Sequence, residues 1–252
     1  SRALASASAR RPNRGPRWSR DAMAVPWLGQ LASSEPPAVV ACVGDSITAR
    51  GYPEYLRGLL RMVAAPKGRC GWSVANFGAS GATAIRQGAG ASPYTQTPRF
   101  KEALQSGADF VLVMFGTNDA REDTWDGRLF VKDLSAIIAA FLRARAAEAD
   151  AGAPAAPPPR IFLLTPPPLY KFRGNCNSLQ GVLHDVLPRQ ILPFIAKESG
   201  LGLVDLLTPL GGPELSKRWL IDRIDGVHPN EEGSQVIARE VCGALEACAR
   251  TG

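Results

Sequence analysis

The stretch VVACVGDSIT, residues Val39–Thr48, decides the fold. Its first five residues are apolar and mostly β-branched, which is typical of a buried strand. Gly44 breaks the run, and Ser46 follows where a strand passes into a helix. In an open α/β sheet this turn lies at the carboxyl edge, where such sheets carry their sites. Gly-Asp-Ser is also ordinary turn or helix-cap sequence, so the rest of the chain has to decide between the two interpretations.

Four more short apolar runs read as strands, at residues 72–77, 109–115, 161–164 and 201–205. Helical spacing of apolar residues fills the intervals, at residues 52–63, 100–106, 129–145, 181–199 and 231–249. Pro188 and Pro193 interrupt the fourth of these helices, which predicts a kink or two segments. Strand and helix alternate throughout, so we expect a three-layer α/β/α sandwich with a five-stranded parallel sheet.

The charge of the chain is unevenly distributed. The net charge is +6, and six arginines precede Asp21, the first acidic residue. Without these six, 23 basic residues face 23 acidic ones, so residues 21–252 are formally neutral and give no electrostatic case for nucleic acid. We therefore expect a basic tail or targeting remnant at residues 1–20 and a single domain at residues 21–252. A secreted and an organelle-targeted location both stay open.

Composition also argues against a membrane span and a metal site. No run approaches the ~18 apolar residues of a spanning helix. The five cysteines lack the spacing of metal ligands and are too few for a disulfide scaffold. A Cys70–Cys176 or a Cys242–Cys248 bridge stays open.

Two histidines are the natural candidates for proton transfer near neutral pH, His184 and His228. His184 lies in a predicted helix and is interpreted as a structural surface residue. His228 lies in a loop three residues after Asp225, a spacing that lets one loop bring a carboxylate to the imidazole.

Ser46, near the start of the domain, is the candidate nucleophile, with His228 as its base and Asp225 as the acid that orients the base. Asp222 and Asp205 are alternatives for the acid, and Asp225 is preferred for its spacing. Donors for an oxyanion would be the backbone N–H groups of Ser46 and Gly81 and the side chain of Asn118. The Gly-rich turn around Gly81 does not have the spacing of a phosphate-binding loop.

Together these segments resemble the four blocks of the SGNH, or GDSL-type, hydrolases. The matching motifs are Gly44-Asp45-Ser46, Asn76-x-Gly78-x-x-Gly81, Gly116-x-Asn118-Asp119 and Asp225-x-x-His228. The resemblance covers about residues 38–250. It implies the flavodoxin-like fold of that family, a Ser46–His228–Asp225 triad, and an oxyanion hole of Ser46, Gly81 and Asn118. Gly78 is an alternative to Gly81, because both lie in one turn.

A finer resemblance connects the chain with sialate O-acetylesterase-like or acetylxylan esterase-like members. It rests on Pro93-Tyr94-x-x-Thr97-Pro98-x-Phe100, on Trp125 after Asn118-Asp119, and on Thr165-Pro166-Pro167-Pro168. It implies a short-chain acyl, above all acetyl, esterase on carbohydrates that needs no metal or organic cofactor. Candidate substrate-binding residues are Asp45, Gly78, Asp119, Trp125 and Tyr170.

Two other functions stay open at this stage. A lysophospholipase or thioesterase would need a long apolar groove, which loops 82–99 and 166–180 would have to form. A catalytically silent carbohydrate-binding module on the same fold would lack turnover. The sequence leaves the particular substrate and the oligomeric state undecided.

Overall fold

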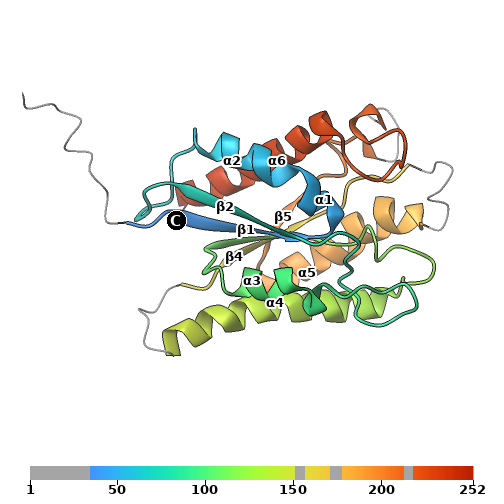
Figure 1. The fold of residues 1–252 in the computed structure, drawn as a ribbon, viewed down its shortest axis with the longest axis horizontal. Helices are drawn as coiled ribbons and strands as arrows, with labels where there is room; N and C mark the ends of the chain where they lie inside the picture. The colour runs from blue at the N-terminus through green and yellow to red at the C-terminus, as the bar shows by residue number, and fades with distance from the viewer. Residues whose placement is uncertain (1–34, 151–156, 171–177, 213–217, 252) are drawn as a thin grey trace, which may run out of the picture. The chain divides into compact units, whose positions relative to one another are not determined.

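A computed structural model provides the fold (Figure 1). The chain divides after Ser34 into two units, and the structure describes residues 35–150, 157–170, 178–212 and 218–251 of the second. The predicted tail at residues 1–20, most of the Pro/Ala segment at 151–159 and residues 171–177 of the aromatic loop lie outside the described residues.

A five-stranded, fully parallel sheet forms the centre of this unit, in the order β2-β1-β3-β4-β5. The strands are β1 (Ala38–Gly44), β2 (Trp72–Gly78), β3 (Phe110–Met114), β4 (Arg160–Leu164) and β5 (Gly202–Val204). Gly44 pairs with Gly78 on one side and with Met114 on the other, so the carboxyl ends of β1, β2 and β3 lie together. The predicted parallel sheet is confirmed.

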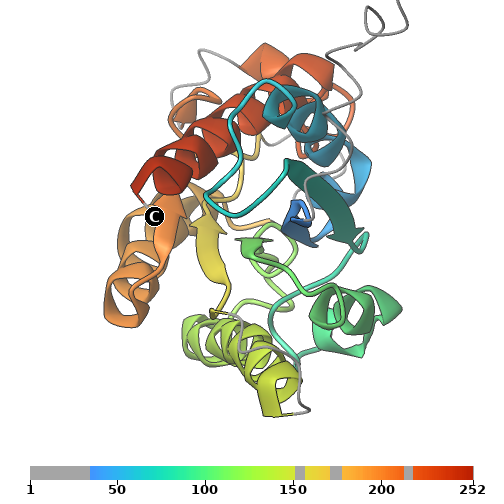
Figure 2. The same ribbon diagram turned by 90° about the vertical axis from the view of Figure 1, so that its left-hand side faces the viewer.

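Helices cover both faces of the sheet (Figures 1 and 2). One layer holds α1 (Ser46–Arg50), α2 (Tyr52–Leu60) and α6 (Glu231–Thr251). The other holds α3 (Pro98–Leu104), α4 (Gly127–Asp150), α5 (Leu192–Ser199) and the π-helix η4 (Val182–Ile191). Short 3₁₀ turns are η3 (Tyr94–Gln96) and η6 (Arg218–Leu220).

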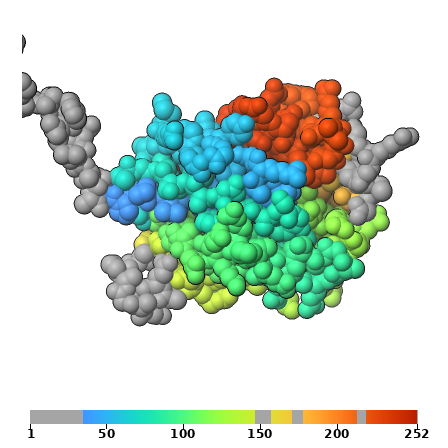
Figure 3. Space-filling view, in the orientation of Figure 1, coloured from blue at the N-terminus to red at the C-terminus, as the bar shows by residue number. Residues whose placement is uncertain are grey.

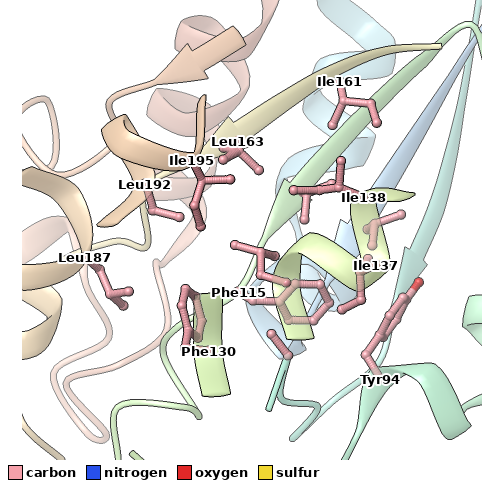
Figure 4. Packing of buried hydrophobic residues seen from close by; sticks show 14 of the residues in the cluster. Tyr94, Phe115, Phe130, Ile137, Ile138, Ile161, Leu163, Leu187, Leu192 and Ile195 are labelled. Carbon is pink, nitrogen blue, oxygen red and sulfur yellow. The ribbon is translucent and has the colours of Figure 1, made fainter. Parts of the chain in front are cut away.

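Alternate residues of the central strands enter two separate cores. In β3, Val111 and Val113 pack toward α4, whereas Leu112 and Met114 pack toward α2 and α6. Figure 4 shows part of the first core, in which Ile195 of α5 lies beside Leu163 of β4, and Phe130 and Ile137 of α4 belong to the same cluster. Strands buried on both faces explain why the sequence shows continuous apolar runs rather than alternation.

The largest local difference from the predicted elements lies at residues 181–199. The expected kink or split is present, but its first half is a π-helix that contains Pro188 and passes directly into α5. Proline removes a backbone donor and blocks regular α-helical bonding, and the wider π-turn accommodates this loss.

The cysteines of the described residues are reduced. Cys42, Cys70, Cys242 and Cys248 are free thiols, so the Cys242–Cys248 bridge left open by the sequence is wrong. Cys176 lies outside the described residues. Among the described helices, none combines the length and the apolar character that a membrane crossing requires.

Candidate active site

Ser46 is the first residue of α1, directly beyond the end of β1. The Asp45 carboxylate caps this helix by accepting the backbone N–H of Ile47 at 2.9 Å. Because Ser46 occupies the first helical position, its own N–H has no acceptor within the helix. The turn therefore presents a hydroxyl and a backbone donor at the same point.

His228 lies against Ser46 across the carboxyl edge of the sheet. Its Nδ1 is 2.6 Å from Asp225 Oδ2, and its Nε2 is 2.7 Å from Ser46 Oγ. A carboxylate only accepts, so Nδ1 carries the proton and Nε2 accepts the Ser46 hydroxyl proton. The three side chains thus form one continuous chain of hydrogen bonds.

The loop between Ile221 and Pro229 holds Asp225 in this position. Asp225 Oδ1 accepts the backbone N–H groups of Val227 at 2.8 Å and His228 at 3.0 Å. Burial acts to raise the pKa of Asp225, but these bonds and the contact with His228 outweigh it and lower the pKa. Asp225 is therefore held as a carboxylate beside the imidazole.

The alternatives from the sequence lie elsewhere. Asp222 accepts the Ile224 N–H, and Asp205 accepts the backbone of Leu207 and Thr208 after β5. His184 in η4 is half-buried, and its Nε2 accepts the Leu169 N–H at 3.0 Å. Burial lowers the pKa of His184, which favours the neutral acceptor form that this bond needs.

Gly81 and Gly78 have different roles in the turn after β2. Gly81 is exposed with φ of +78°, and its N–H donates to no acceptor among the described residues. Gly78 is buried, and its N–H donates to Asn76 Oδ1 at 2.9 Å. A Cβ at Gly78 would lie 2.2 Å from the backbone N of Ala49, so glycine allows α1 to pack there. Of the two glycines, Gly81 is therefore the one whose backbone N–H is available to bind an oxyanion.

The Asn118 amide lies between this turn and α1. Its Nδ2 donates to the Ala82 carbonyl at 3.0 Å and lies 3.5 Å from Asp45 Oδ2. Asp45 is 1% exposed, and burial, opposed by the Ile47 N–H and reinforced by the charge of Asp119, raises its pKa to about 7. The Asn118 amide therefore contacts both the turn that carries Gly81 and the residue that precedes Ser46.

Asp119 is a buried residue that contacts both the loop after β2 and the loop after β3. It is fully buried, with Oδ1 accepting the Ile85 N–H at 2.8 Å and Oδ2 the Gly116 N–H at 3.1 Å. Burial raises its pKa to about 7 against the effect of these backbone donors. Asp119 thus links the loop that carries Gly81 to the loop that carries Asn118.

Four of the five candidate substrate-binding residues do not fit that role. Asp45, Gly78 and Asp119 are buried supports of the loops, as described above. Tyr170 is 2% exposed, and its hydroxyl lies 3.4 Å from the backbone carbonyl oxygens of both Leu210 and Gly212, which share its one proton as acceptors. Only Trp125, which is partly exposed and packs against Phe130, stays a predicted substrate contact.

Sequence reasoning missed the supporting role of Asn76. Its Nδ2 donates to the Ala49 carbonyl at 3.2 Å while its Oδ1 accepts the Gly78 N–H, so it joins the end of α1 to the end of β2. The sequence signal that could have indicated this role is an asparagine near a strand end, two residues before a glycine.

The sequence of this chain is similar to sequences of known proteins. Residues 42–236 match the model of the GDSL-like Lipase/Acylhydrolase family. An acetylxylan esterase of Xylanibacter ruminicola is 32% identical over 245 residues, which is 87% of this chain and 46% of that protein. The chain therefore spans less than half the length of this relative.

Solved structures share the fold at low identity. A carbohydrate acetylesterase from Sinorhizobium meliloti has a TM-score of 0.61 at 16% identity, covering 84% of this chain and 99% of that one. A variant of an acetyl-xylooligosaccharide esterase from Geobacillus stearmophilus has a TM-score of 0.59 at 21% identity, covering 84% and 95%. With the family model matched over most of the described sheet and through His228, this chain belongs to the GDSL-like lipase/acylhydrolase family.

Proposed function

We propose that this protein is a serine esterase that removes acetyl groups from carbohydrates. The observation that carries the proposal is the chain of hydrogen bonds from Asp225 through His228 to Ser46, at the carboxyl edge of the sheet. A hydroxyl bound to an imidazole, which is itself bound to a carboxylate, is the arrangement of an activated serine nucleophile.

In the first step, His228 Nε2 takes the proton of Ser46 as Oγ attacks the carbonyl carbon of the ester. The carbonyl oxygen becomes an oxyanion, which the N–H groups of Ser46 and Gly81 and the Asn118 amide stabilise. His228 then gives its proton to the sugar oxygen, the C–O bond breaks, and an acetyl-Ser46 intermediate remains. Asp225 stabilises the imidazolium throughout.

In the second step, water takes the place of the sugar. His228 Nε2 removes a proton from the water as its oxygen attacks the acetyl-Ser46 carbonyl, through an oxyanion in the same position. The proton returns to Ser46 Oγ as the bond to the acetyl group breaks, which releases acetic acid and restores the hydroxyl.

The substrate class is supported by the relatives rather than by the triad, since the same three side chains serve many esters. The acetylxylan esterase is 32% identical to this chain, and two structural neighbours carry carbohydrate acetylesterase or acetyl-xylooligosaccharide esterase in their names. An acetylated oligosaccharide is therefore the substrate that we propose.

The test is hydrolysis of 4-nitrophenyl acetate, butyrate and octanoate, and of acetylated xylo-oligosaccharides, by the wild type and Ser46→Ala. We expect a rate on acetate that exceeds the rate on octanoate at least tenfold, release of acetate from the oligosaccharides, and a loss of about 10⁴–10⁶-fold in Ser46→Ala. The residual rate reflects the oxyanion donors alone.

Three outcomes contradict the proposal. A rate highest on octanoate indicates a lysophospholipase or thioesterase. Equal rates for the wild type and Ser46→Ala remove the serine mechanism. Oligosaccharide binding with no acetate release by the wild type indicates a silent carbohydrate-binding module.

A further inference from the structure

Two adjoining hollows lie on the helical layer that α2 and α6 form. One, of about 370 Å³, is lined by Trp219 and Leu220 of η6 and by Glu232 of α6. The other, of about 320 Å³, is lined by Tyr55 and Leu59 of α2. Both are lined by Gln235 and Arg239, so the two hollows adjoin at these side chains, and together they are called the α2–α6 groove. Figure 3 shows the surfaces of α2 (light blue) and α6 (red) meeting on this face.

The groove combines an exposed aromatic ring with hydrogen-bonding side chains. Trp219 is 47% exposed, although a side chain of this size normally packs into an interior. Glu232, Gln235 and Arg239 supply acceptors and donors along the same wall. A pyranose ring has one face of C–H groups, which stacks on an aromatic ring, and a rim of hydroxyls, which bond to such planar polar groups.

One wall of the groove, formed by Trp219 and Leu220, is hydrogen-bonded to the loop that carries His228. The Trp219 carbonyl accepts from Asn230 Nδ2 at 2.5 Å, and the Leu220 carbonyl accepts the Asn230 N–H at 3.0 Å. Asn230 follows His228 by two residues and immediately precedes α6. Trp219 is therefore fixed to the segment that positions the imidazole.

The other wall begins beside the helix of Ser46. Helix α2 follows α1 after Gly51, and a Cβ on Gly51 would lie 2.7 Å from the Ser234 hydroxyl of α6. The start of α2 and the start of α6 are thus packed tightly beside α1. The groove lies between the following turns of the two helices. The groove extends along α2 and α6, and its Trp219 end is joined through Asn230 to the segment that carries His228.

We propose that the α2–α6 groove binds sugar residues of the substrate chain that flank the acetylated unit, with Trp219 as a stacking platform. The inference rests on the proposed carbohydrate esterase function. It predicts that the enzyme distinguishes a long oligosaccharide from a small ester of the same acyl group, since only the long chain reaches the groove.

The experiment compares Trp219→Ala with Phe194→Ala. Phe194 is a matched control, because it is an aromatic residue 59% exposed on α5, in the opposite helical layer. In the Ser46→Ala background, calorimetry measures binding of xylohexaose, cellohexaose and mannohexaose. In the active background, KM and kcat are measured on 4-nitrophenyl acetate and on acetylated xylobiose and xylohexaose.

We expect Trp219→Ala to weaken binding of the hexaose that the parent binds, and to raise KM for acetylated xylohexaose, each about tenfold. Kinetics on 4-nitrophenyl acetate and the melting temperature should stay unchanged, and Phe194→Ala should match its parent in every assay. Because binding is measured without turnover, the groove is tested even if the esterase function fails.

Three results would overturn the inference. The first is equal binding of the hexaoses by Trp219→Ala and Phe194→Ala, and the second is no binding of any hexaose by the Ser46→Ala parent. The third is a wild-type dimer that Trp219→Ala separates into monomers, since the groove would then be an interface between two copies of the chain. Failure of the esterase proposal is recognised separately, by the absence of Ser46-dependent acetate release.

Discussion

The two ends of β3 carry aspartates in opposite environments, Asp109 partly buried and Asp119 fully buried. At the amino end, Asp109 Oδ1 accepts from Arg69 and Arg145, and Oδ2 accepts the Val39 N–H at 2.9 Å. Beyond the carboxyl end, Asp119 accepts only backbone N–H groups, and no arginine or lysine of the described residues forms a salt bridge with it. One edge is held by ion pairs and the other by neutral donors.

The two kinds of partner suit different tasks, the ion pairs of Asp109 stabilising the fold and the backbone donors of Asp119 supporting the proposed catalytic site. A guanidinium beside Asp119 would neutralise its charge, but it would also place a fixed cation against the two loops that carry Gly81 and Asn118. Backbone donors hold the loops without that cation and leave the developing oxyanion to the aligned N–H groups. The comparison predicts that carboxylates at the carboxyl edge affect turnover, whereas Asp109 affects the free energy of unfolding.

The largest expected effect comes from Asp225→Asn. An amide at this position no longer fixes the proton on His228 Nδ1 or stabilises the imidazolium, so kcat on 4-nitrophenyl acetate should fall about 10³–10⁴-fold. Asp222→Asn is the control from the same loop, because its carboxylate contacts the Ile224 N–H and not the imidazole. If Asp225→Asn kept a tenth of the activity, or if both variants lost equal activity, the assigned acid would be wrong.

A smaller effect is expected from Asp119→Asn. An amide accepts through one oxygen only, so the variant must give up either the Ile85 or the Gly116 N–H. The Gly81 and Asn118 donors then lose their common support, and kcat should fall about 10–100-fold with KM within threefold, because misplaced oxyanion donors weaken the transition state more than the ground state.

Asp109→Asn is the matched variant at the other end of β3. It leaves two arginines sharing one neutral acceptor, and the free energy of unfolding should fall by about 2–3 kcal/mol in chemical denaturation. Turnover at 25 °C should match the wild type. A loss of kcat in Asp109→Asn as large as in Asp119→Asn would end the distinction between the two edges.

The same contrast explains what could be predicted from the sequence. The strands of the sheet are buried on both faces, and their apolar runs are long enough to reveal both their type and their order of occurrence. Ser46, Asp225 and His228 stand in short motifs whose spacing carries geometric meaning, and the structure brings these three side chains together.

The supports of the site could not be found in this way. Asp119 accepts the backbone N–H of Ile85, 34 residues away, and a backbone N–H group leaves no trace in side-chain identity. Asp45 lies beside the Asn118 amide, 73 residues away, and no local pattern connects the two. The ion pairs of Asp109 reach 40 residues back to Arg69 and 36 forward to Arg145, and no local pattern connects them. The α2–α6 groove likewise depends on how two helices far apart in the chain pack.

The smallest effect expected is a pH dependence of stability. The pKa of Asp119 is raised to about 7 in the folded protein, against about 3.9 for an unfolded chain. Between these values the folded protein binds a proton that the unfolded chain has released, so this contribution to stability is present at low pH and is lost as pH rises toward 7. Above that pH both states are ionised and the dependence ends.

The measurement is the free energy of unfolding of the wild type and Asp119→Asn at pH values from 5 to 8. The difference between the two proteins matters, because the lowered pKa of His184 acts in the opposite direction and cancels in the subtraction. The raised pKa of Asp45 cancels except for the part that the charge of Asp119 contributes, which belongs to the effect of Asp119. The advantage of the wild type over Asp119→Asn should shrink as pH rises, with a slope of at most about 1.4 kcal/mol per pH unit for one proton, and level off above pH 7. A difference that is constant from pH 5 to 8 would mean that Asp119 does not titrate in this window, and the raised pKa would no longer explain how its environment differs from that of Asp109.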